Sequence, residues 1–163
     1  MSQSKKKIED SRESLARAKL LKLESEDKWV FHGSPHKIEV FEPRQAYQYP
    51  KSKEEKIADG KPVVFASPSA DIAIFMSIIN VVNAPLGLQS WFGTDGEGKI
   101  KFKATKETID QLHNSKGYVY IFDKTKFIPG SPLESLSYET VSPNDVTIVS
   151  EKDLPKNIEI RNF

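Results

Sequence analysis

The chain has 163 residues, of which 37% are hydrophobic and 29% are charged, a length that suits one ordinary globular domain. It contains no cysteine, which excludes disulfides, thiolate nucleophiles and cysteine-ligated metal centres, and with only three histidines we expect no metal site. The 24 basic and 23 acidic residues give a net charge of +1, so no overall field draws the protein onto nucleic acid or an anionic membrane.

No apolar stretch reaches the roughly 20 residues that a membrane-spanning helix needs. The longest, residues 70–82, is interrupted by Asp71, Ser77 and Asn80. The lysines at 5–7 are followed by charged residues instead of the apolar segment of a signal peptide. We therefore expect a cytoplasmic protein that makes no use of a membrane.

Residues 5–28 are strong helix formers without glycine or proline, and their apolar side chains form a thin stripe at helical spacing. This pattern predicts an amphipathic N-terminal helix within residues 1–28, followed by one domain over residues 29–163. The stripe suits packing on that domain, and pairing with a second copy is the alternative that it leaves open. The oligomeric state is therefore not predicted.

The rest of the chain alternates short β-prone segments with turns. The expected strands are 29–31, 38–41, 62–66, 99–103, 118–122, 138–141, 146–150 and 158–160. The segment 45–61 is polar and is expected to form a surface loop or a short helix. Asp95-Gly96 fits a hairpin turn ahead of the strand at 99–103.

Two helices are expected among these strands. Ser67 or Ser69 should cap the first, which carries Asp71 in its first turn and should run to about Asn83. A shorter one should begin near Thr105. Helices gather early and strands late without a regular βαβ alternation, so the sequence predicts an α+β domain.

Three separated segments carry side chains suited to ligand binding. Phe31-His32-Gly33-Ser34, at a strand end, can present an imidazole and bare main-chain amides. Val64-Phe65-Ala66-Ser67 runs into the helix that carries Phe75, so aromatic rings could wall a pocket for a flat ligand. Glu139 is a single carboxylate in a β-prone stretch. Taken singly, each has an ordinary structural explanation: a buried histidine at a turn, core phenylalanines and a solvated strand glutamate.

In this order the three segments resemble the ADP-ribosyltransferase superfamily of the diphtheria-toxin and poly(ADP-ribose) polymerase type, over residues 29–150. His32-Gly33-Ser34 is similar to its first-strand motif, Val64–Ser67 through Phe75 to its aromatic motif, and Glu139 to its late-strand glutamate. Small bacterial members with a His-Gly-Ser-Pro-His string look similar as well. The resemblance implies split antiparallel sheets with flanking helices, behind the N-terminal helix.

The resemblance also implies that NAD is a substrate and that ADP-ribose is transferred to an acceptor. His32 would bond a ribose hydroxyl, the main chain of Gly33 the nicotinamide carboxamide, and Glu139 would stabilise the oxocarbenium-like cation as the catalytic residue. The residues that would bind NAD are His32, Gly33, Ser34, Phe65, Ser67 and Phe75.

Departures from the family pattern leave the acceptor unidentified. Val64 stands where the polymerases have a tyrosine, and Ser137 stands where protein-modifying toxins have glutamine or glutamate. The acceptor could be a protein or a nucleic acid. The alternative function is a non-catalytic module of this fold that binds a protein or nucleic-acid partner. An RNA 2′-phosphotransferase is disfavoured, since Arg44 is the only arginine between Arg17 and Arg161.

A row of lysines, Lys99, Lys101 and Lys103, alternates along one expected strand. Such a row could contact phosphates of a nucleic acid. It is more typical of a solvated edge strand protected from aggregation.

Overall fold

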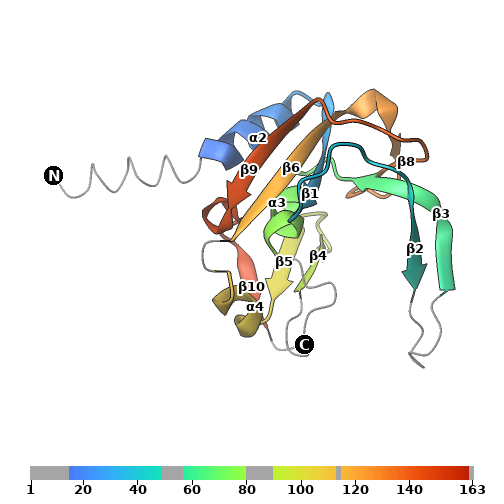
Figure 1. Cartoon of the computed structure of the whole chain (residues 1–163). Coiled ribbons are helices and arrows are strands. Elements are labelled where there is room, and N and C mark those ends of the chain that lie inside the picture. Colours follow the sequence, from blue (N-terminus) through green and yellow to red (C-terminus); the bar gives the residue numbers. More distant parts are fainter. Residues whose placement is uncertain (1–14, 49–56, 80–89, 113–114, 162–163) are drawn as a thin grey trace.

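The computed structural model describes residues 15–48, 57–79, 90–112 and 115–161, and its architecture is α+β with three small sheets (Figure 1). The helices are α2 (Leu15–Ser25), α3 (Ala70–Ile78) and α4 (Lys106–Asp110). Within the described ranges no helix has both the length and the apolar character needed to cross a membrane.

The first sheet is built around β6 (Lys116–Asp123), which lies between β1 (Trp29–Ser34) and β9 (Asp145–Ser150) in antiparallel pairings. Successive side chains of β6 enter two different buried clusters, one on each face of the sheet. A strand covered on both faces is expected to be almost continuously apolar, as residues 118–122 are. The three predicted strands of this sheet are confirmed.

The second sheet adjoins the first through a single bridge, in which the N–H and C=O groups of Phe31 and Ser67 bond each other at 2.7 Å. Its antiparallel strands are, in order, β2 (Arg44–Gln48), β3 (Ile57–Ala66), β8 (Ser135–Ser137) and β7 (Ile128–Pro129). The β2–β3 ribbon extends away from the body at the right of Figure 1.

The third sheet has β5 (Ile100–Ala104) at its centre, antiparallel to β4 (Ser90–Thr94) and parallel to β10 (Ile158–Ile160). The hairpin at Asp95-Gly96 is confirmed, and Gly98 completes it with a φ of +80°. The lysine-bearing strand is thus not an edge strand, because β4 and β10 satisfy both of its sides. The strand β4 was not predicted, since its glycine-rich surroundings favoured a loop.

Helix α3 lies between the first and third sheets, and most of its side chains are buried. Its close approach to the first sheet depends on small residues. A Cβ added to Gly33 would lie 1.8 Å from the carbonyl oxygen of Ala73, and one added to Gly117 would lie 2.6 Å from that of Ser77. The two glycines therefore set the distance between the helix and strands β1 and β6.

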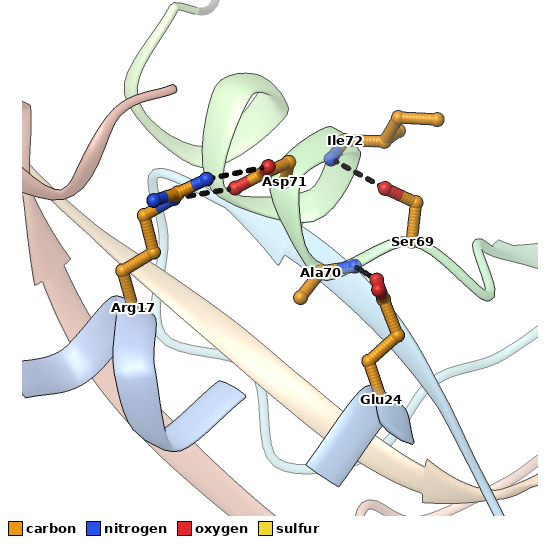
Figure 2. Close-up of polar contacts among 6 residues, drawn as sticks. All are labelled: Arg17, Glu24, Ser69, Ala70, Asp71 and Ile72. Atoms are coloured by element: carbon orange, nitrogen blue, oxygen red, sulfur yellow. Dashed lines mark hydrogen bonds and ion pairs between the residues drawn. The ribbon is translucent and has the colours of Figure 1, made fainter. Parts of the chain in front are cut away.

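Helix α2 packs on the N-terminal end of α3 (Figure 2). The guanidinium of Arg17 donates two hydrogen bonds to the carboxylate of Asp71, at 2.8 and 2.9 Å, and both side chains are half-buried. Glu24 accepts a hydrogen bond at 2.6 Å from the N–H of Ala70, an amide without a partner inside its own helix. Burial raises the pKa of Glu24, against the lowering effect of that N–H. The remainder of the predicted N-terminal helix, residues 5–14, lies outside the described residues.

The first turn of α3 is capped as the sequence predicts. Ser69 is the N-cap residue, and its hydroxyl accepts from the N–H of Ile72 at 3.3 Å (Figure 2). The helix ends at Ile78, with Ile79 as the C-cap, and is shorter than predicted. The predicted end at Asn83 lies outside the described residues.

Replacing Arg17 with alanine should lower the free energy of unfolding by about 1–2 kcal/mol, because the half-buried carboxylate of Asp71 loses two charge-assisted hydrogen bonds. Replacing Lys19 is the matched control: its 3.4 Å ion pair with Asp145 is exposed and should contribute little. Urea unfolding of both variants measures the difference. Equal effects of the two replacements would contradict this role of α2.

Residues 38–41 do not form the predicted strand. The hydroxyl of Tyr120 accepts from the N–H of Ile38 and donates to the carbonyl of His36, at 2.5 and 3.0 Å, and these bonds replace those of a ladder. Only Phe41 makes a bridge, to Val141.

Two other polar stretches also differ from the prediction. The segment 45–61 was expected as a loop or short helix, yet residues 44–48 and 57–61 pair as strands. Pairing of the two strands satisfies the hydrogen bonds of their main-chain N–H and C=O groups, whichever side chains they carry. Conversely, the strand expected at 138–141 is absent: β8 ends at Ser137, whose hydroxyl bonds the N–H and the carbonyl of Glu139 at 3.3 and 3.2 Å. A side chain that bonds its neighbouring main chain competes with the ladder.

Candidate functional site

A cavity of about 350 Å³ lies where β1 and β3 end and α3 begins. His32 and Gly33 contribute to it from β1, Phe65 and Ser67 from the end of β3, and Met76 from α3. Residues of two predicted motifs, separated by more than thirty positions in the chain, therefore meet in one space. Its walls are mainly apolar, as in most sites for small organic ligands.

At this cavity, the main chain of Gly33 forms part of an edge of β1 that no described strand pairs with. The N–H and C=O of Phe31 point away from β6, toward Ser67, and the alternation of an antiparallel ladder gives Gly33 the same direction. Beyond Ser67 the chain turns into α3, so none of the described strands continues beside Gly33. One main-chain donor and one main-chain acceptor are available there to a ligand.

His32 is held in one orientation and one tautomer. Its Nδ1 lies 2.6 Å from the carbonyl oxygen of Phe65, and because a carbonyl only accepts, Nδ1 carries the hydrogen. The ring also packs edge-on against Phe41, with centroids 4.8 Å apart. Burial lowers the pKa of His32, the bond to Phe65 opposes this, and the charge of Arg44 adds to the lowering. The imidazole is therefore neutral at neutral pH, and its Nε2 is an acceptor with no hydrogen-bond partner among the described residues.

Two predicted NAD-binding residues lie elsewhere. Ser34 is the buried last residue of β1, and its hydroxyl accepts from the N–H of His36, in the turn that follows, at 3.1 Å. Phe75 is buried in the core, with its ring 4.9 Å from that of Phe102. Residues 72, 73 and 76 are the ones that α3 turns toward the cavity, and Phe92 of β4 supplies an aromatic wall there. The sequence motif identified the helix but not which of its faces meets the cavity.

The acidic residue that lines the cavity is Glu134, and Glu139 is not among the lining residues. Strand β8 runs antiparallel to β3, with Ser135 opposite Ala66 and Ser137 opposite Val64. Glu134, just before β8, therefore lies beside the end of β3, whereas the chain carries Glu139 away from it into an exposed bend. Glu134 is exposed, and no hydrogen bond or ion pair to its carboxylate is present within the described structure.

Comparison of the chain with protein-family models, curated proteins and solved structures finds no match. Within the described residues, no three His, Asp or Glu side chains are grouped so as to hold a metal ion.

Proposed function

We propose that the protein is an NAD-dependent ADP-ribosyltransferase that binds the nicotinamide end of NAD in the cavity between β1, β3 and α3. The observation that carries this proposal is the open edge of β1 at Gly33, in a cavity that His32, Phe65 and Glu134 share. A neutral histidine acceptor, a main-chain donor and acceptor, apolar walls and one carboxylate match the chemistry of a nicotinamide ribosyl group.

The nicotinamide ring suits the open edge and the walls. Its carboxamide has one carbonyl and one NH₂, which pair with the N–H and the C=O of Gly33, respectively. Phe65 and Phe92 provide aromatic faces, which are favourable neighbours for the positively charged pyridinium. The Nε2 of His32 accepts a hydrogen bond from a ribose hydroxyl.

The reaction breaks the bond between the nicotinamide nitrogen and C1′ of the ribose. The electron pair leaves with nicotinamide, which departs as a neutral base, while the ribose becomes an oxocarbenium-like cation. The carboxylate of Glu134 stabilises this cation electrostatically. An atom of the acceptor then forms a bond to C1′ and gives up its proton to solvent. We assign to Glu134 the role that the sequence motif suggested for Glu139.

Calorimetric titration of nicotinamide riboside and NAD tests the binding part of the proposal. Replacing His32 with alanine should weaken the binding of both by about tenfold, the loss expected for one hydrogen bond to a half-buried group. His36→Ala is the matched control, because the side chain of His36 is exposed and lies outside the cavity. If wild-type protein binds neither ligand at millimolar concentration, the transferase proposal fails and the fold serves as a binding module instead.

A further inference from the structure

A second cavity, of about 290 Å³, lies on the β2 side of His32 and Phe65. These two residues line both cavities, so they form the partition between them. The second cavity is enclosed by the segment 38–45 and by the strand residues 63–65. Val63 is one of the apolar residues that line it, and Arg44 lies opposite Val63 in the β2–β3 pairing.

Arg44 is the one cation among the residues that line the second cavity. None of the described residues forms an ion pair or a side-chain hydrogen bond with its guanidinium. This distinguishes it from the other described arginines, Arg17 and Arg161, which pair with Asp71 and Glu159. The hydrogen-bonding capacity of a guanidinium, five N–H donors in a rigid fork, is thus unused at a cavity wall.

The partner that matches this guanidinium is an oxyanion. A guanidinium binds phosphate with two parallel hydrogen bonds, and because burial keeps His32 neutral, Arg44 is the one positive charge that attracts an anion to this cavity. Glu42 also lines the cavity but makes no ion pair with Arg44 within 4.0 Å, so its charge opposes an anion without neutralising the arginine. Arg44 therefore attracts a bound anion, and Glu42 repels it.

We propose that the second cavity is an anion subsite in which Arg44 binds the phosphates of a ligand whose nicotinamide ribosyl part occupies the first cavity. A cavity of about 350 Å³ holds only part of a dinucleotide, and the shared wall of His32 and Phe65 places the second cavity next to the first. The inference rests on the proposed function for the identity of the ligand, but not for the subsite itself.

The test uses two probes, each of which contains a different part of the ligand. ADP-ribose carries the pyrophosphate and lacks nicotinamide, whereas nicotinamide riboside carries nicotinamide and lacks phosphate. Arg44→Gln should weaken ADP-ribose at least tenfold and leave nicotinamide riboside within twofold, and Glu42→Gln should tighten ADP-ribose. Lys126→Gln, which removes an exposed cation outside both cavities, should leave both affinities unchanged. Binding is measured by calorimetry at constant salt.

The outcomes separate the two proposals. ADP-ribose binding that depends on Arg44, without binding of nicotinamide riboside, would support the anion subsite and overturn the transferase. Nicotinamide riboside binding together with ADP-ribose binding that ignores Arg44 would overturn the anion subsite alone. An equal loss with Arg44→Gln and Lys126→Gln would also overturn it, since that result reports net charge and not a site.

Discussion

Replacing Glu134 with glutamine should slow the release of nicotinamide from NAD by about 10²–10³-fold and leave the dissociation constant of NAD nearly unchanged. The glutamine keeps the shape of the side chain but removes the negative charge that faces the oxocarbenium-like cation. Because the charge develops only as the bond breaks, the loss belongs to the chemical step and not to binding. A fluorescence or chromatographic assay of released nicotinamide, with calorimetry for NAD, measures the two parts separately.

Glu139→Gln is the matched control for this prediction. It makes the same chemical change five residues further along, in an exposed bend that lies outside the cavity. Its rate of nicotinamide release should stay within about twofold of wild type. A large loss with Glu139→Gln and none with Glu134→Gln would contradict the assignment and restore the one suggested by the sequence motif.

Replacing Gly33 with alanine should destabilise the fold by about 3 kcal/mol, the upper part of the range for forcing extra volume into a packed interior. The new Cβ would lie 1.8 Å from the carbonyl oxygen of Ala73 and 2.9 Å from the amide nitrogen of Ser77, both main-chain atoms of α3. The helix cannot avoid such contacts by rotating a side chain, so α3 has to move away from β1. Urea unfolding monitored by circular dichroism measures the loss.

Gly96→Ala provides the comparison, because a Cβ at Gly96 meets nothing within 4 Å and the residue has no positive φ. That variant should be as stable as wild type or slightly more stable, as the unfolded chain loses freedom. If Gly33→Ala were equally harmless, the close approach of α3 to the first sheet would be refuted. The glycine of the His-Gly-Ser motif therefore has a packing role as well as the ligand-facing role that the resemblance implies.

The sequence predicts best those elements whose pattern is set by burial on both sides. Strands β1 and β6 were expected because apolar, β-branched and aromatic residues follow one another there, and they pack between two buried clusters. Strand β9 was expected from the same kind of residues but buries only one face, with Val146 and Ile148 exposed on the other. The N-cap of α3 at Ser69 was expected from local hydrogen bonding alone. The strand predicted at 62–66 is the second half of β3 and is confirmed. Strand β2 and the first half of β3 were missed, because they pair through the main chain and their sequence is mainly polar.

For the candidate site, the motifs near a strand end were more informative than the isolated glutamate. His32 and Gly33 follow directly from the position of β1, and Phe65 and Ser67 from the end of β3, so all four reach the cavity. Two glutamates lie five residues apart near β8, and only the register between β8 and β3 decides which of them is beside the cavity. Register is a long-range property that local spacing does not contain.

The most direct measurement of the central claim is nitrogen NMR of ¹⁵N-labelled histidine during a titration with NAD. Binding in the proposed cavity should shift the Nε2 resonance of His32, which accepts the ribose hydroxyl, and change Nδ1 little, since that atom already donates to Phe65. The resonances of the exposed His36 should not move. An unchanged His32 at saturating NAD, or shifts confined to His36, would contradict nucleotide binding at this cavity.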